Sequence, residues 1–316
     1  MFTKLKAPNS EDEITKLWKH TDKVYVSVLC TSFNHELYIQ DAIESFLAQE
    51  TEYKFEIIIH DDASHDNSAE IIQRYHEKFP SIIKPIYQRE NQFSEYPTKP
   101  LINCLMDSEG EYIAICEGDD FWVDNRKIQK QICSIDEFKE VDICFTSAFG
   151  LSPGNIATKL AEYGTQTKLF GVSEVIRSGG GFMPTPSLFI RRAVLVNLPD
   201  WFKEAKVGDF FIQILGSLKG GALYIPEQAV CYRIMAINSW TSKNTGIQLY
   251  YHRVNMKNTY CKLAYNYPQL VEPLKYISRK GDFQALLAFA KRGQIMLSVK
   301  MIYQMMNKKI SIYKRG

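Results

Sequence analysis

Short apolar runs alternate with stretches of helical periodicity through roughly the first half of the chain, and this alternation constrains the fold more than any other feature. Four runs have the length and β-branched content of buried strands: Val24–Cys30, Phe55–His60, Ile82–Tyr87 and Glu111–Cys116. The segments between them, at 36–49, 66–79 and 98–107, place apolar residues three or four apart, as helices do. This order predicts an α/β fold with a doubly wound, mainly parallel, Rossmann-like sheet.

The rest of the sequence continues this pattern less regularly. We expect helices at 125–138, 172–178 and 208–218, strands at 142–148, 187–190, 222–225 and 229–234, and a loop or short hairpin at 150–168. Residues beyond about 246 are helical in pattern, with broken periodicity. We therefore divide the chain into a main domain at 1–240, with halves at about 24–150 and 151–240, and a helical C-terminal extension at 241–316.

Composition limits the class of protein. The 316 residues carry a formal net charge of +2 and are 45% hydrophobic, which fits a globular protein and gives no case for a nucleic-acid partner. The seven cysteines have no CxxC or paired His spacing, so neither a zinc site nor a disulfide framework is expected. The N-terminus lacks a signal-peptide core, and no apolar run approaches the ~20 residues of a membrane-spanning helix. We expect a cytoplasmic protein, either free or peripheral on the inner face of the membrane.

Three polar clusters follow strands of the predicted sheet: Thr31–Asn34, Asp61–Asp66 and Glu117–Asp120. Ligands of such sheets bind beyond the carboxyl ends of the strands, so the clusters are expected to converge on one site. The third cluster is the strongest signal, because three carboxylates packed so closely repel one another unless a cation lies between them. Oxygen ligands of this kind suit Mg²⁺ or Mn²⁺ shared with substrate phosphates. The alternative is a solvated acidic turn.

Three segments carry a resemblance to a known family: VSVLCTSFNHELYIQDAIESFLAQ, EIIIHDDASHDNS and GEYIAICEGDDFW. They resemble the nucleotide-binding half of glycosyltransferase family 2, and the likeness covers about residues 24–240. It implies the GT-A fold, a nucleotide-sugar donor, and Mn²⁺ or Mg²⁺ as cofactor. It places Asp120 on the metal and Asp119 on the ribose or the metal. Glu117 stands where the family often has Asp, which implies a shifted metal geometry.

The resemblance also implies three residues that pack on the base and ribose of the donor: Thr31, Phe33 and Asn34. Asp62 is implied as the contact to the base, and a carboxylate can accept the imide N–H of uracil or a nucleobase amine. Asp66 belongs to the same motif, but an aspartate at this position is better explained as a helix cap. His60 and His65 beside it are expected to be structural.

Asp209 resembles the aspartate of the family's short ED or GD element, which is the catalytic base of inverting transfer. The reaction needs one carboxylate near the acceptor hydroxyl, on the face opposite the leaving diphosphate. The alternative is that Asp209 only caps the helix that follows. Upstream, Gly179–Pro186 (GGGFMPTP) can either face the acceptor or diphosphate with its backbone amides or form a tight turn.

Tyr232-Arg233 and Asn238-Ser239-Trp240 resemble a later motif of the family. Met235 occupies the place of its histidine, which joins the metal shell in some GT-A enzymes. The departure puts such a ligand in doubt and leaves water or phosphate oxygens to complete the coordination. Arg233 can pair with diphosphate oxygens, and the alternative is a structural salt bridge.

The resemblance implies an inverting glycosyltransferase of the hexosyltransferase class. It would move a sugar from a nucleoside-diphosphate sugar, UDP-linked, to a hydroxyl of a glycan or lipid-linked glycan, in bacterial surface-polysaccharide assembly. The alternative, which Glu117 and Met235 keep open, is a non-catalytic nucleotide-sugar-binding protein with the same fold. A nucleotidyltransferase is disfavoured, because no GxGxR-like loop follows the first strand.

The C-terminal sequence is basic. After Asp282 it contains seven Lys or Arg residues and no Asp or Glu, interleaved with apolar residues. A basic, apolar helix can lie on an anionic bilayer, which would suit a lipid-linked acceptor and a peripheral membrane contact. The alternative is a terminal helix packed on the body of the protein or on a partner.

Overall fold

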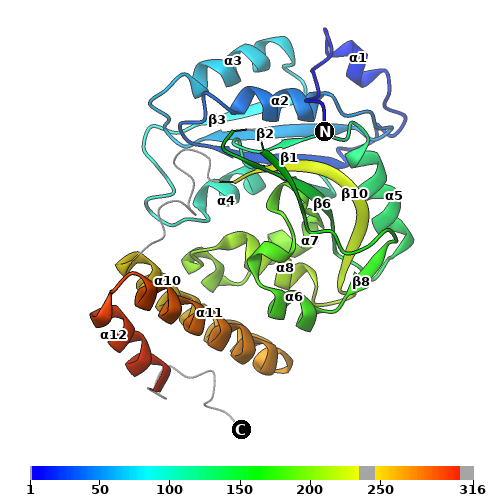
Figure 1. The fold of residues 1–316 in the computed structure, drawn as a ribbon. Coiled ribbons are helices and arrows are strands. Elements are labelled where there is room, and N and C mark those ends of the chain that lie inside the picture. Colours follow the sequence, from blue (N-terminus) through cyan, green and yellow to red (C-terminus); the bar gives the residue numbers. More distant parts are fainter. Residues whose placement is uncertain (1, 155, 235–245, 307–316) are drawn as a thin grey trace.

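The computed structural model describes residues 2–154, 156–234 and 246–306. Its centre is one sheet with the strand order β3-β2-β1-β4-β9-β6-β10-β5, to which β7 adds beside β6 and β8 beside β10 (Figure 1). The strands are β1 (Val26–Ser32), β2 (Phe55–Asp61), β3 (Ile83–Tyr87), β4 (Tyr112–Ile115), β5 (Phe121–Trp122), β6 (Ile143–Ser152), β7 (Ile156–Leu160), β8 (Lys168–Phe170), β9 (Phe189–Arg191) and β10 (Ala222–Arg233).

Six of the ten strands pair in parallel with a neighbour. Strands β3, β2, β1 and β4 are parallel to one another, and so are β6 and β10. The short β9 lies antiparallel between β4 and β6, and β5 lies antiparallel to β10 at the edge. The predicted α/β fold with a mainly parallel sheet is confirmed, and the antiparallel insertions curl it (Figure 1).

Helices cover both faces of the sheet, because successive strand residues point to opposite sides. On β1, Val28 joins one core with residues of α2, α3 and α5, while Leu29 joins a second core with residues of α4, α6 and α8. The α-helices are α1 (Asp12–Thr15), α2 (Ile39–Leu47), α3 (Ser68–Lys78), α4 (Lys99–Met106), α5 (Lys127–Glu137), α6 (Val172–Ser178), α7 (Arg192–Val196), α8 (Gly208–Gly216), α10 (Ile247–Asn266), α11 (Val271–Lys291) and α12 (Ile295–Met306). Short 3₁₀ turns lie at η1 (Gly180–Phe182), η2 (Thr185–Ser187), η3 (Asp200–Glu204) and η4 (Pro268–Leu270).

Three local predictions differ from the structure. The two strands expected at 222–225 and 229–234 are one strand, β10, whose pairing with β6 shifts register on either side of Gln228. Pro226 cannot donate to the ladder, and the irregularity follows it directly. The strand β5 and the helix α7 were not predicted, because each is too short to carry a periodic pattern. The hairpin expected within 150–168 is present as β6 and β7.

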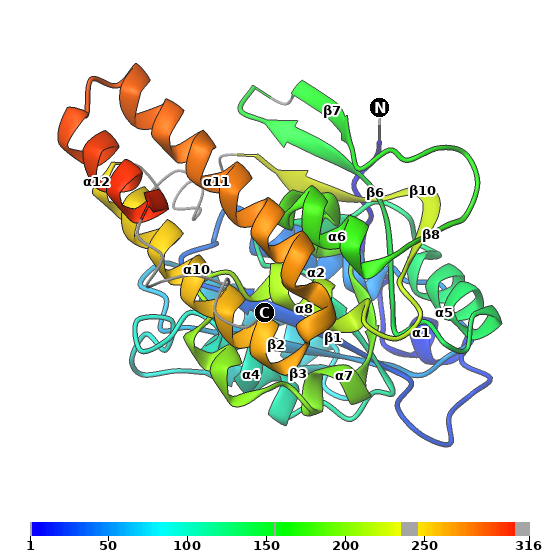
Figure 2. The same ribbon diagram turned by 90° about the horizontal axis from the view of Figure 1, so that it is seen from below.

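The C-terminal helices pack on the body of the protein. Tyr260 and Leu263 of α10 and Leu274 of α11 belong to the same hydrophobic core as Leu29. Figure 2, which views the molecule from below, shows α11 running beside α6. This core runs across residue 240, so the division of the chain there remains a prediction. Within the described ranges, no helix is both long enough and apolar enough to span a membrane.

Candidate active site

Three carboxylates gather at the carboxyl end of β4, where the chain turns toward β5. One oxygen from each of Glu117, Asp119 and Asp120 lies within 4.8 Å of the other two. The turn is closed by the Asp120 N–H, which donates to the Glu117 carbonyl at 3.0 Å. The Gly118 N–H donates to the Thr31 carbonyl at 2.9 Å, which fixes the turn against the end of β1. We call these three residues the acidic cluster.

Gly118 is required by the space around it. A Cβ atom there would lie 2.9 Å from Nδ1 of His35 and 2.9 Å from Cδ1 of Ile39. Carbon atoms need about 3.5–4.0 Å of separation, so any other residue would push the turn away from α2. The glycine therefore lets the acidic cluster approach the loop after β1 closely.

Asp120 is the most constrained member of the cluster. It is buried, and its Oδ1 accepts the Arg233 N–H at 2.7 Å. Its Oδ2 is buried as well and has no hydrogen-bond partner among the described residues. Burial, followed by the negative charge of Asp119, raises the pKa of Asp120 well above its usual value. A buried carboxylate oxygen without a partner, with two more carboxylates beside it, fits a divalent cation.

The other two members of the cluster are more accessible. Glu117 is exposed and Asp119 is half-buried. Partial desolvation, then the charge of Asp119, then the charge of Asp209 raise the pKa of Glu117. Asp209 therefore lies near enough for its charge to act on Glu117, although the two residues lie on different elements. A cation bound here would favour the ionised form of every one of these groups.

Arg233 is the last residue of β10, and four contacts hold its side chain beside the acidic cluster. Its Nη1 donates to the Asp119 carbonyl at 2.5 Å, and its Nη2 forms an ion pair with Asp41. The guanidinium lies 4.9 Å from the ring centre of Tyr38 and 4.5 Å from that of Phe121. The salt bridge considered for Arg233 is thus present, and a contact between Arg233 and the diphosphate remains a prediction.

The loops after β1 and β2 are bonded to each other. The Asn34 N–H donates to Ser64 Oγ at 2.9 Å, and Asn34 Oδ1 accepts the His65 N–H at 2.8 Å. Asp61 holds Ser64 in place through bonds to its N–H and hydroxyl. The Phe33 ring lies edge-on to His65, with ring centres 6.3 Å apart. The structure therefore brings Phe33 and Asn34 together with the second polar cluster, as the sequence predicted.

Asp62 is buried, and its carboxylate already has partners. Its Oδ1 accepts the Gln92 N–H at 2.6 Å, and its Oδ2 accepts the Phe93 N–H at 3.0 Å. Asp62 thus orders the segment that follows β3. Each carboxylate oxygen can accept a further bond, so a contact to the nucleobase remains a prediction.

Asp66 and His60 have structural contacts. Asp66 accepts the Ser68 N–H and hydroxyl at the start of α3, and it also accepts the Glu36 N–H. This joins the first residue of α3 to the loop before α2. The N-cap position of α3 is Asn67, so Asp66 contacts the start of the helix without occupying the N-cap. The buried His60 lies with Nε2 3.2 Å from the Asn103 side-chain nitrogen.

Asp209 lies in the first turn of α8, one residue after the helix begins. The residue before the helix is Val207, so Asp209 does not occupy the N-cap position. Its Oδ1 accepts the Phe210 N–H at 2.8 Å, and its Oδ2 accepts the Thr185 hydroxyl at 3.0 Å. Burial raises the pKa of Asp209, while these two bonds lower it. The Gly179–Pro186 segment therefore reaches the site through Thr185.

Tyr232 and His35 were not assigned a role from the sequence. Burial raises the pKa of the Tyr232 phenol, and the charges of four acids raise it further: Asp120, Glu117, Asp119 and Asp209. Tyr232 therefore lies near enough for the charges of the acidic cluster and of Asp209 to act on it. His35 Nδ1 is buried without a hydrogen-bond partner in the part of the chain that the structure describes, and burial lowers the His35 pKa. Met235 and Asn238-Ser239-Trp240 lie outside the described residues.

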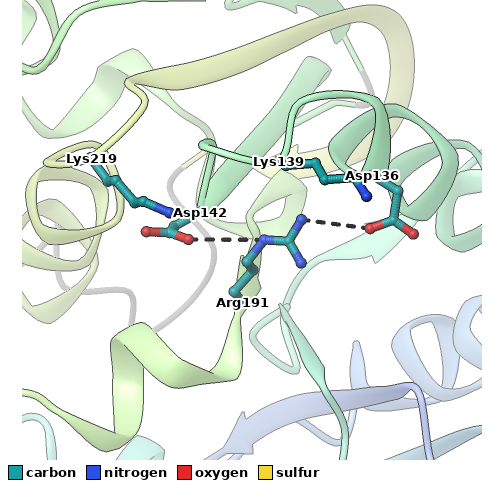
Figure 3. Close-up of a pocket in the computed structure, with 5 residues that line it drawn as sticks. All are labelled: Asp136, Lys139, Asp142, Arg191 and Lys219. Carbon is teal, nitrogen blue, oxygen red and sulfur yellow. Dashed lines mark ion pairs between the residues drawn. The ribbon is translucent and has the colours of Figure 1, made fainter.

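A separate pocket lies near the start of β6 (Figure 3). It has a volume of about 500 Å³ and is lined by Asp136, Lys139, Asp142, Arg191 and Lys219. Arg191 forms ion pairs with Asp136 and Asp142 and donates to the Val141 carbonyl at 3.1 Å. These bonds tie β9 to neighbouring segments, so we assign the charged residues that line the pocket a structural role.

Comparison with known proteins identifies the family. The Glycosyl transferase family 2 model matches residues 27–195, more than half of the chain. An uncharacterised protein of Mycobacterium tuberculosis is 30% identical over 220 residues, which cover 70% of this chain and 62% of that protein. The chain thus spans less than two thirds of the length of that relative.

Solved structures share the fold at low sequence identity. Staphylococcus aureus TarS 1-349, in complex with UDP-GlcNAc, has a TM-score of 0.59 at 17% identity, covering 76% of this chain and 66% of that one. The mannosyltransferase PcManGT of Pyrobaculum calidifontis, in complex with GDP-Man and Mn²⁺, has a TM-score of 0.51 at 13% identity, covering 96% and 87%. The predicted GT-A fold is confirmed. The chain belongs to glycosyltransferase family 2.

Proposed function

We propose that this protein is a metal-dependent, inverting glycosyltransferase that moves a sugar from a UDP-sugar to a hydroxyl of a glycan or lipid-linked glycan. The observation that carries the proposal is the buried Asp120 Oδ2, which has no hydrogen-bond partner among the described residues and belongs to a cluster of three carboxylates. Membership of glycosyltransferase family 2 supports the reaction class. The UDP-GlcNAc in the TarS complex supports the choice of donor.

Asp120 and Asp119 would hold the cation, Mn²⁺ or Mg²⁺, with Glu117 as the third nearby carboxylate. When bound, such an ion neutralises charge on the departing diphosphate. The Mn²⁺ in the PcManGT complex supports this choice of metal. Arg233 holds the cluster in place: its Nη1 donates to the Asp119 carbonyl, and its backbone N–H donates to the Asp120 carboxylate. The Asp120 Oδ2 has no hydrogen-bond partner among the described residues, so it would be available to a cation.

Asp209 would act as the base. Its carboxylate would accept the proton of the acceptor hydroxyl as that oxygen attacks the anomeric carbon, on the face opposite the diphosphate. Burial raises the pKa of Asp209, which increases its proton affinity. The Thr185 hydroxyl fixes the orientation of one carboxylate oxygen at 3.0 Å.

The donor nucleoside would lie over the loops after β1 and β2. Phe33 offers an aromatic face for stacking on the base. Asn34 lies beside it in the loop after β1, and Thr31 lies near the carboxyl end of β1. Asp62 is proposed to contact the base, and Asp119 the ribose. A lipid-linked acceptor would be met at a bilayer surface, and the C-terminal helices have the composition that suits such a contact.

Transfer from UDP-sugars in the presence of Mn²⁺ tests the proposal. Asp120→Asn and Asp209→Asn are both expected to abolish transfer while the fold persists, and Asp12→Asn on the surface helix α1 serves as the control. Asp209→Asn should still bind UDP with Mn²⁺, because it removes only the base. Wild-type turnover in either site variant would refute that residue's role. Tight UDP binding without transfer or hydrolysis by the wild type would instead indicate the non-catalytic alternative.

A further inference from the structure

The outer face of α12 is apolar and is left uncovered by the described chain. On its inner side, α12 packs through the buried Met301 against Ala285 and Phe289 of α11. On its outer side lie four exposed residues at helical spacing: Ile295, Val299, Ile302 and Met306. Positions i, i+4, i+7 and i+11 fall on one face of a helix. The helix is therefore apolar on the side that faces solvent.

Adjacent residues widen this face. Met296 and Tyr303 stand beside it, and the most exposed side chains have between 70% and 76% of their area accessible: Ile295, Met296, Tyr303 and Met306. Single exposed apolar residues are normal on protein surfaces, but a contiguous group marks an interaction site.

The outer side of α11 continues this surface with apolar and basic residues. Tyr276, Lys280, Phe283 and Leu287 are exposed at the same helical spacing. At the start of this row a groove of about 400 Å³ is lined by four cations, one tyrosine and one acid: Arg177, Lys275, Arg279, Lys280, Tyr276 and Glu272. We call these outward faces and the groove the α11–α12 surface.

Charge identifies the partner that fits the surface. The described residues 283–306 contain three Lys or Arg and no acid, and the groove adds four cations and one acid. A second copy of the chain would bring like charges together across the same face, which opposes self-association. An anionic lipid bilayer offers both complements, since its interface accepts apolar side chains and its phosphates attract Lys and Arg.

We propose that the α11–α12 surface docks this protein on an anionic lipid bilayer. Both views place α12 on the side of the molecule where β10 ends (Figures 1 and 2), and β10 ends at Arg233 beside the acidic cluster. Docking would therefore bring the carboxyl edge of the sheet toward the membrane. The inference concerns where the protein works and does not depend on the proposed reaction.

Co-sedimentation of the full chain with vesicles tests this proposal. Binding is expected to vesicles that contain phosphatidylglycerol, to weaken with added salt, and to be weak with phosphatidylcholine alone. Met296→Glu/Met306→Glu is expected to weaken binding about tenfold or more, because two carboxylates replace apolar anchors. Met106→Glu on α4 is the matched control, since Met106 is 76% exposed and Met306 is 75% exposed.

Three results would overturn the proposal. The first is equal binding to both kinds of vesicle. The second is equal binding by the double variant and the wild type. The third is a dimer in sedimentation velocity that the double variant dissociates, with no vesicle binding, which would make the surface an interface between copies. An unchanged melting temperature establishes that each variant is folded. No sugar transfer is measured, so failure here leaves the proposed reaction untouched.

Discussion

Replacing Thr185 with valine tests the geometry around the proposed base. The Thr185 hydroxyl donates to Asp209 Oδ2 at 3.0 Å and lowers the pKa that burial raises. A hydrogen bond to a charged group contributes about 1.5–3 kcal/mol, and 1.36 kcal/mol corresponds to one pKa unit. Thr185→Val is therefore expected to raise the pKa of Asp209. Because a base must be deprotonated to act, activity at low pH should fall.

The assay is the pH profile of kcat/KM for sugar transfer. In Thr185→Val the acidic limb of the profile should move to higher pH, with kcat/KM at low pH falling about tenfold or more, while activity recovers at high pH. Thr185→Ser keeps the hydroxyl and should keep the limb near its wild-type position. A valine variant whose acidic limb does not move would refute the role given to Thr185. A serine variant that behaves like valine would show that packing, not the hydroxyl, matters.

Two further predictions concern stability. Gly118→Ala places a methyl group 2.9 Å from Nδ1 of His35, so urea titration should show a loss of about 1–3 kcal/mol of unfolding free energy. Gly181→Ala is the control, because its Cβ meets nothing within 4 Å and its stability should change little. Equal losses in the two variants would contradict the steric argument. The buried Lys127 ammonium lies 4.0 Å from the Trp122 ring centre, and burial lowers its pKa from 10.5 to about 8. The unfolded chain therefore binds the Lys127 proton more tightly than the folded chain, so the free energy of unfolding should rise with pH between about 8 and 10.5. Lys127→Met should flatten that rise and increase stability at pH 7. A variant with an unchanged slope of stability against pH would contradict the role given to Lys127.

The sheet and the position of the site could be predicted because they depend on local patterns. Strands β1, β2 and β4 are short apolar runs that end on polar residues, and parallel strands bring those ends to one edge. The acidic cluster needs only Glu117, Asp119 and Asp120, which are neighbours in the chain. The pattern could not show that β10 is one strand, because Pro226 interrupts its alternation.

The partners of the site residues could not be predicted, because they come from distant segments. Arg233 pairs with Asp41, 192 residues away in the sequence. Thr185 reaches Asp209 across 24 residues, and no local signal connects the two. Burial of Asp120, whose Oδ2 has no hydrogen-bond partner among the described residues, likewise depends on how β10 packs beside β5. Sequence therefore identified the carboxylates and structure identified what holds them.

The role of the buried Asp120 carboxylate is tested most directly by calorimetric titration of UDP, with Mn²⁺ or with a chelator. The wild type should bind UDP with Mn²⁺ and lose at least about tenfold in affinity with the chelator, a loss of about 1.4 kcal/mol or more. Asp120→Asn should bind weakly in both conditions, because its amide still accepts the Arg233 N–H but is a poorer cation ligand. Equal wild-type affinity with Mn²⁺ and chelator, or Mn²⁺-dependent binding of wild-type strength by Asp120→Asn, would contradict the proposed metal site.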